Sequence, residues 1–254
     1  MSGPMSVSQM VLLVAAGVLG GLTGSIAGLA SVATYPALLV AGLPPVTANV
    51  TNTVALVFNG IGSVLGSRPE LAGQRRRVMR LLPVAVAGGV AGAVLLLSTP
   101  ADGFEKVVPV LLGVASLAIL APVRPPSEPV GGRPNARRIG QALAVGAICV
   151  YGGYFGAAAG VLLLALLLRS GAAGLAHANA TKNVVLGGAN LSAAVIFACV
   201  APVHWTAVAT LGLGCLVGSR LGPVVVRHAP SGAMRVAIGV AGLALAVKLG
   251  LDAY

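Results

Sequence analysis

Apolar residues run along the chain in long stretches, separated by short polar ones. Within these stretches they do not alternate with polar residues, so the pattern does not fit the strands of a membrane barrel. With their flanks, many stretches reach about 17–25 residues, the length that an α-helix needs to cross a bilayer. We therefore predict an all-α polytopic membrane protein. Its predicted membrane segments are residues 8–25, 29–41, 46–66, 78–98, 105–121, 139–155, 158–169, 175–199, 204–226 and 232–252.

Two of these segments, 29–41 and 158–169, are too short for easy spanning. Such a segment is either a broken helix that crosses with its neighbours or a re-entrant piece packed inside protein. A re-entrant 158–169 would place Arg227 and Arg235 outside the cell, against the cytoplasmic preference of basic residues. We therefore expect both short segments to cross, with five crossings per half and both termini outside.

Composition supports a membrane location. Of the 254 residues, 57% are hydrophobic and 8% are charged, whereas soluble domains carry about 25% charged residues. The mean hydropathy is +0.98. We expect a multi-pass protein of the cytoplasmic membrane, in contact with lipid.

The net charge of +11 would suggest nucleic-acid binding in a soluble protein. Here the arginines lie in clusters between the apolar segments, which is the pattern of cytoplasmic loops. We therefore expect no nucleic-acid partner. Oligomeric state is not indicated by the sequence. The clusters are Arg68, Arg75, Arg76, Arg77 and Arg80; Arg124, Arg133, Arg137 and Arg138; and Arg227 and Arg235.

A stretch rich in proline and glycine, APVRPPSEPVGGRPNAR at 121–137, divides the chain near its middle. It cannot be helical throughout, because proline and glycine interrupt helices. We predict a first transmembrane repeat over 1–120, a cytoplasmic linker over 121–138 and a second transmembrane repeat over 139–254.

The two halves share a polar motif in the same context. Residues 48–53 read ANVTNT and residues 178–183 read ANATKN, and in each half a glycine-rich stretch and a short apolar segment precede the motif. Small residues four apart, such as Gly88 and Gly92, follow later and favour close helix packing. An odd number of crossings per half would invert the second repeat. Inverted repeats with short, glycine-interrupted segments are typical of transporters with a site at the membrane midplane, although an old duplication that serves only packing gives the same repeat.

The polar motifs supply the candidate binding residues. Asn49, Asn52 and Thr53 stand at i, i+3 and i+4 and share one helix face, and Asn179, Lys182 and Asn183 do the same in the second half. Buried amides need partners, which the opposite cluster or a substrate can supply.

Lys182 is the most informative residue, because an ionisable group within a membrane segment indicates a functional site. A lysine among amide and hydroxyl donors suits an oxyanion, and nearby helix N-termini would add positive dipole ends. The alternative is that Lys182 extends to the cytoplasmic interface.

The sequence offers few residues for proton coupling, metal binding or enzymatic catalysis. The acidic residues all fall in loops or at segment ends, so proton coupling would have to use His177, Lys182 or the substrate itself. Cys149, Cys199 and Cys215 lack the spacing of metal ligands. We expect no metal, no cofactor and no enzymatic activity.

These motifs resemble the TauE/SafE family of membrane exporters over nearly the whole chain. The resemblance is carried, in order, by YPALLVAGLPP at 35–45, ANVTNT at 48–53, YGGYFGAAAG at 151–160, ATKN at 180–183, HW at 204–205 and LGCLVGSRLGP at 213–223. It implies export of sulfite or small organosulfonates from the cytoplasm. The positions that it carries over to a substrate site are Asn49, Thr51, Asn52, Thr53, Asn179, Thr181, Lys182 and Asn183.

The sequence thus predicts a secondary transporter that binds a small anion between two inverted halves and works by alternating access. Two alternatives remain open. An anion channel would need a continuous wet pore. A membrane-embedded enzyme would need a nucleophile with a base, for which only His177 offers a starting point.

Overall fold

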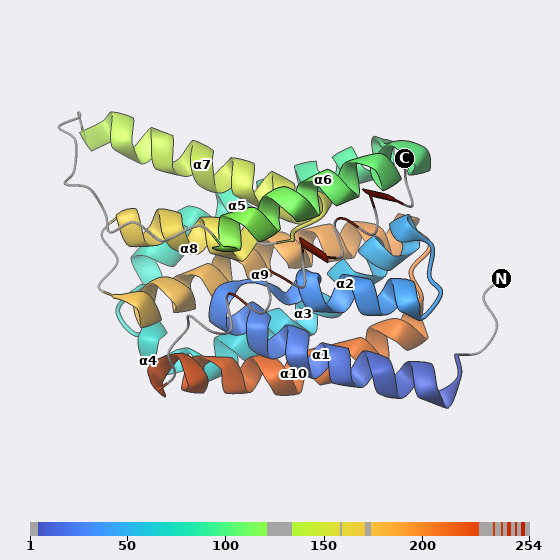
Figure 1. Ribbon diagram of the computed structural model, residues 1–254. Helices are drawn as coiled ribbons and strands as arrows, with labels where there is room; N and C mark the ends of the chain where they lie inside the picture. Colours follow the sequence, from blue (N-terminus) through green and yellow to red (C-terminus); the bar gives the residue numbers. More distant parts are fainter. Residues whose placement is uncertain are drawn as a thin grey trace.

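The computed structural model describes residues 5–120, 134–157, 159–170 and 174–228, together with positions 236, 240, 243, 244, 247, 250 and 251. All regular structure in this part of the chain is helical, which confirms the predicted all-α class (Figure 1). The helices are α1 (Val7–Ala27), α2 (Ala30–Val40), α3 (Pro45–Gly66), α4 (Arg68–Leu71), α5 (Arg75–Ser98), α6 (Ala101–Leu120), α7 (Pro134–Tyr154), α8 (Ala159–Arg169), α9 (Leu175–Val200) and α10 (Trp205–His228).

The helix bounds agree with the predicted segments to within a few residues, with two differences. The single-turn helix α4 was not predicted, and α7 begins at Pro134, inside the stretch predicted as linker. Proline suits the first position of a helix, where its missing N–H is not needed. Most of the predicted segment 232–252 and residues 121–133 of the linker lie outside the described residues.

Five of the described helices, α1, α3, α5, α9 and α10, are long and apolar enough to cross a membrane. Apolar side chains stand exposed on the outside of the bundle, among them Leu191, Val195 and Leu213. Such residues suit contact with lipid. The short helices α2 and α8 have 11 residues each. The chain is therefore a multi-pass membrane protein.

The two halves repeat one order of helices. α1, α2, α3 and α5 begin at residues 7, 30, 45 and 75, and α7, α8, α9 and α10 begin at residues 134, 159, 175 and 205. The lengths follow the same sequence of long, short, long and long. In Figure 1, α1 runs from the right towards the left and α7 runs from the left towards the right.

Each half contains a helix break, a short non-helical segment at a glycine between a long helix and a short one. α1 ends at Gly28, whose φ of 77° is left-handed, and α2 starts two residues later. α7 ends before Gly156, with a φ of 75°, and α8 follows. Glycine adopts such angles without the steric cost that a Cβ brings. The two breaks meet, because a side chain on Gly28 would overlap the backbone of Gly160.

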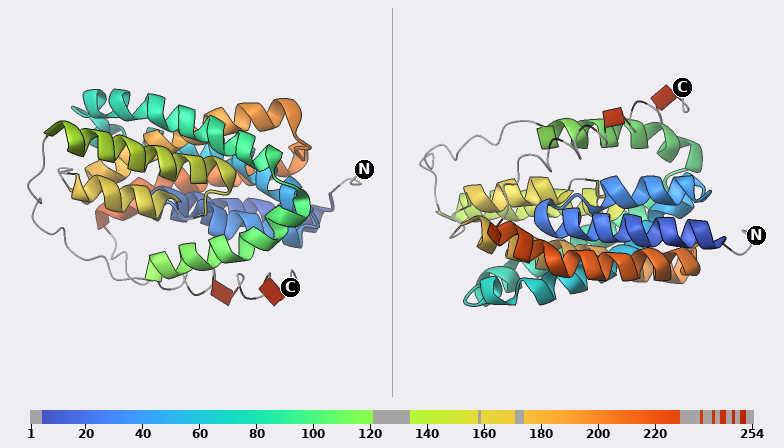
Figure 2. Two further views of the ribbon diagram at one scale, coloured as in Figure 1. Left: turned by 90° about the horizontal axis from the view of Figure 1, so that it is seen from above. Right: turned by 60° about the horizontal axis from the view of Figure 1, so that its bottom comes forward.

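Close pairs of helices join the halves to each other. α1 packs along α10, where Gly17 and Gly21 lie directly against the α10 backbone. α5 packs along α7, where Gly88 and Gly92 do the same. This confirms the close packing predicted at Gly88 and Gly92. Figures 1 and 2 show α10 beside α1, with α6 along the outside of the bundle.

Candidate functional site

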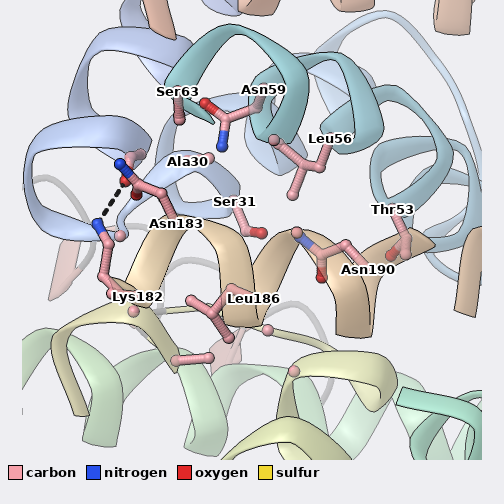
Figure 3. A pocket seen from close by; sticks show the side chains of 18 of the residues that line it. Ala30, Ser31, Thr53, Leu56, Asn59, Ser63, Lys182, Asn183, Leu186 and Asn190 are labelled. Atoms are coloured by element: carbon pink, nitrogen blue, oxygen red, sulfur yellow. Dashed lines mark hydrogen bonds between the residues drawn. The ribbon is translucent and has the colours of Figure 1, made fainter. Parts of the chain in front are cut away.

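A small cavity lies where the two helix breaks meet α3 and α9 (Figure 3). Its volume is about 40 Å³, and one water needs about 10–15 Å³, so it has room for a few waters or one small polyatomic ion. Glycines from both breaks form part of its wall. Its polar lining residues are Ser31, Thr53, Asn59, Ser63, Lys182, Asn183 and Asn190.

Lys182 brings a cation into this cavity. Its side chain is 1% exposed, and Nζ donates to the carbonyl oxygens of Gly24 at 3.1 Å and Ser25 at 3.4 Å. These carbonyls belong to the last turns of α1, where the helix dipole is negative. Burying an ammonium group is costly, and the carbonyls offset part of that cost with partial charges only.

Two further residues of the polar motifs line the cavity. Asn183 follows Lys182 on α9, and its Nδ2 donates to the carbonyl oxygen of Ser25 and to Ser67 Oγ, both at 3.4 Å. Thr53 comes from α3 in the first half, and its hydroxyl donates to the carbonyl oxygen of Asn49 at 3.1 Å. The cavity thus takes Thr53 from one motif and Lys182 and Asn183 from the other.

Two oxygen atoms in the cavity wall are buried without a hydrogen-bond partner among the described residues. They are Oδ1 of Asn59 and Oγ of Ser63, both on α3. A buried polar atom that lacks a partner is uncommon and calls for a ligand or water. The Ser63 hydroxyl can donate as well as accept, and Asn59 also carries a donating amide group.

Asn49 and Asn179 do not line the cavity. Each donates a hydrogen bond to a backbone carbonyl group at one of the two helix breaks. Asn49 Nδ2 donates to the carbonyl oxygen of Tyr154, the last residue of α7, at 2.8 Å. Asn179 Nδ2 donates to the carbonyl oxygen of Ser25, near the end of α1, also at 2.8 Å. Each half therefore satisfies a free carbonyl group at the broken helix of the other half, where the α-helix leaves such groups unpaired.

Asn52 makes its contacts within the first half. Its Oδ1 accepts from the Thr34 hydroxyl at 2.6 Å, and its Nδ2 donates to Ser31 Oγ at 3.2 Å. Asn52 thereby orients Ser31, which does line the cavity.

The two central threonines of the motifs contact neighbouring loops. Thr51 Oγ1 accepts from the backbone N–H of His204 at 3.1 Å. The Thr181 hydroxyl donates to Gln74 Oε1 at 2.8 Å, and Gln74 Nε2 donates to the carbonyl oxygen of His177 at 3.0 Å. Gln74 therefore fastens the loop after α4 to the start of α9.

Of the eight predicted site residues, the structure brings Thr53, Lys182 and Asn183 together around the cavity and places the other five in the hydrogen bonds that support it. Ser31 and Ser63 were missed. Ser63 lies four residues after Asn59 on the same helix, so helical spacing offers a signal for it. Asn59 and Asn190 stand out in the sequence as amides further along the two motif helices.

A cluster of aromatic rings packs around Phe155 in the cavity wall. Phe155 lines it and packs edge-on against Tyr35, with ring centroids 5.2 Å apart. Phe104 at the start of α6 contacts Tyr154 and Phe155. Within the described residues, no group of three or more histidine, cysteine or acidic side chains is placed to hold a metal ion.

A bundle of apolar helices with a polar cavity around a buried lysine is an arrangement expected of a membrane transporter. Sequence comparison agrees with this class. The family described as "Sulfite exporter TauE/SafE" matches residues 12–249. The chain therefore belongs to the TauE/SafE family, a family of membrane transporters and not of enzymes.

Two curated relatives align over most of the chain. The "Probable membrane transporter protein ORF9" of Sinorhizobium sp. is 28% identical over 96% of this chain and 93% of its own length. The "Probable membrane transporter protein YfcA" of Escherichia coli K12 is 25% identical over 93% of this chain and 87% of its own length. No solved structure matches the chain significantly.

Proposed function

We propose that the protein is a secondary transporter that exports a small sulfur-containing anion, sulfite or a small organosulfonate, across the cytoplasmic membrane. The observation that carries the proposal is the burial of Lys182 in a polar cavity between the two halves. An anion beside Lys182 would neutralise a charge that backbone carbonyls only partly compensate.

The substrate class rests on charge, hydrogen bonding and size. Lys182 supplies a positive point charge, and the Ser63 hydroxyl and the Asn59 amide group can donate to the oxygens of an oxyanion. A cavity of about 40 Å³ suits sulfite, whereas an organosulfonate would need the cavity to widen. The family description, which names sulfite export, supports the same class.

The transport mechanism that we propose is alternating access between two inverted repeats. Broken helices at the substrate site are characteristic of such transporters. The repeated helix order and the opposite directions of α1 and α7 support the inverted arrangement (Figure 1). We propose that the Gln74 contacts and the ring contacts around Phe155 open in turn.

The test is uptake of isotope-labelled sulfite by proteoliposomes that contain the purified full-length protein. Lys182→Met keeps the length of the side chain but removes its charge, so we expect sulfite uptake to fall to the level of empty liposomes. Lys106→Met removes a lysine that is exposed on α6 and should transport normally. Equal uptake by wild type and Lys182→Met would refute the site.

Two further experiments test the substrate and the transport mechanism separately. Competition by sulfite, taurine, thiosulfate and chloride ranks the substrates, with and without a pH gradient. Uptake of another anion that requires Lys182, without any competition by sulfite or sulfonates, would overturn the substrate and keep the site. Counterflow, in which unlabelled anion inside the liposomes accelerates labelled uptake, is expected of a carrier and not of a channel.

A further inference from the structure

A second, larger cavity lies at the end of the bundle where α5 and α7 begin. Its volume is about 620 Å³, against about 40 Å³ for the cavity at Lys182. Four arginines line it: Arg76, Arg77 and Arg80 from α5, and Arg138 from α7. None of the described residues in its lining is acidic. The cavity therefore concentrates positive charge between a helix of the first half and a helix of the second.

The arrangement of the arginines favours an anion. Arg76 and Arg80 stand four residues apart on one helix, where like charges repel. Arg77 Nη2 donates to the carbonyl oxygen of Leu167 at 3.2 Å, and a guanidinium group has five N–H donors, so this bond leaves others for a ligand. Gln141 and Ser170 add neutral polar groups to the same wall. Arginine pairs with phosphate through two parallel hydrogen bonds, which makes a phosphate group a fitting occupant.

The surroundings of the cavity favour a lipid over a soluble ion. On the same two helices, next to the arginines, Met79 is 58% exposed, Ile139 is 61% exposed and Leu143 is 69% exposed. Exposed apolar side chains on membrane helices contact acyl chains. If the arginines bind the phosphate group of a lipid, the acyl chains of that lipid would therefore lie against these apolar side chains. The abundance of arginine assigns this end to the cytoplasmic side, where anionic lipids are attracted to basic clusters.

We propose that this cavity, defined by Arg76, Arg77, Arg80 and Arg138, binds the phosphate headgroup of an anionic phospholipid. The lipid bridges α5 and α7, whose closest contacts run through Gly88 and Gly92 further along the pair. This site is separate from the cavity at Lys182, and none of its lining residues is shared with it.

Native mass spectrometry of the purified full-length protein in detergent tests the proposal. The probes are phosphatidylglycerol and phosphatidylcholine with identical acyl chains. We expect preferential binding of phosphatidylglycerol, and binding about fivefold weaker for each arginine removed by Arg76→Gln or Arg80→Gln. The matched control is Arg75→Gln, because Arg75 is exposed on the same helix but does not line the cavity. Equal loss in Arg75→Gln and Arg76→Gln would show nonspecific attraction and overturn the site.

Two further experiments test the lipid site, one with a variant of α7 and one with a competing soluble anion. Arg138→Gln removes an arginine from the other helix and should weaken phosphatidylglycerol binding in the same way, which covers the case in which an α5 variant does not fold. Inorganic phosphate at constant ionic strength should compete poorly with the lipid. If it displaces phosphatidylglycerol completely at millimolar concentration, the occupant is a soluble anion and the lipid assignment is wrong.

Discussion

The side-chain amide of Asn49 donates to the backbone carbonyl oxygen of Tyr154 at 2.8 Å, which ties α3 of the first half to the broken end of α7 in the second. Asn179 makes the reciprocal bond to Ser25 at the end of α1, also at 2.8 Å. Each half thus completes the interrupted helix of the other. The two breaks and the cavity beside them depend on both halves being in place.

Removing either asparagine should destabilise the fold. Asn49→Ala and Asn179→Ala each leave a buried carbonyl group without this donor, and we expect a loss of about 0.5–2 kcal/mol in the free energy of unfolding. Thermal unfolding in detergent measures the loss. Ser98→Ala is the control, because the exposed Ser98 hydroxyl donates only within its own helix. Asparagine variants as stable as Ser98→Ala would show that the crossed bonds contribute nothing.

Gly28 should tolerate substitution less well than Gly42. Both have a positive φ, 77° and 89°, so alanine adds about 1–2 kcal/mol of backbone strain at either position. Only Gly28 also faces Gly160, whereas a side chain on Gly42 meets nothing within 4 Å. We expect Gly28→Ala to lower the unfolding temperature well beyond Gly42→Ala. An equal effect of the two substitutions would mean that the contact between the breaks is dispensable.

Removing the charge of Lys182 should abolish the stabilisation of the protein by sulfite without a large change in its unfolding temperature. Lys182→Met removes the cost of burying an ammonium group, but it also removes the hydrogen bonds to the carbonyl oxygens of Gly24 and Ser25. These two effects oppose each other, so Lys182→Met should unfold close to the wild-type temperature. Sulfite at 100 times its dissociation constant should stabilise the wild type by about 2.7 kcal/mol. The variant should show no such stabilisation. A sulfite-induced shift that survives in Lys182→Met would place the ligand elsewhere.

Ser63 should matter for the ligand and not for the fold. Its hydroxyl has no hydrogen-bond partner among the described residues, so Ser63→Ala removes no bond of the protein. We expect unchanged thermal stability and roughly ten- to 150-fold weaker sulfite binding, which corresponds to the loss of one hydrogen bond to a charged group, about 1.5–3 kcal/mol. Isothermal titration calorimetry measures the affinity. Unchanged affinity would mean that Ser63 does not contact the anion.

The hydrogen bond from Thr181 to Gln74 should hold the loop after α4 against α9. Valine has the shape of threonine but cannot donate to Gln74 Oε1. We expect Thr181→Val to increase hydrogen exchange over residues 67–74, and Thr181→Ser to exchange like wild type because it keeps the hydroxyl. Exchange in Thr181→Val that matches wild type would show that the bond does not restrain the loop.

Much of the fold could be predicted from the pattern of apolar and polar residues, because a bilayer restricts the alternatives. Apolar stretches of spanning length have to be helices, and proline and glycine mark their ends. The predicted segments therefore agree with α1 to α3 and α8 to α10 to within a few residues. α4 escaped prediction, because four polar and apolar residues in a basic loop carry no periodic signal.

The candidate site was predictable only in part. A duplicated polar motif with one lysine in an apolar chain indicates where chemistry should lie, and helical spacing tells which residues share a face. Spacing does not tell what that face meets. Asn49 and Asn52 belong to the same motif as Thr53, yet they bind backbone and side-chain groups beside the cavity while Thr53 lines it.

The amino-acid sequence alone was enough to predict the membrane helices and the duplicated polar motif and to single out Lys182 as a candidate, since each follows from local composition and spacing. Only the tertiary structure decided which motif residues surround the cavity. The partners of Lys182 and Asn49 are carbonyl groups 158 and 105 residues away along the chain. Every residue carries a carbonyl group, so only the packing of the two broken helices can select these particular ones.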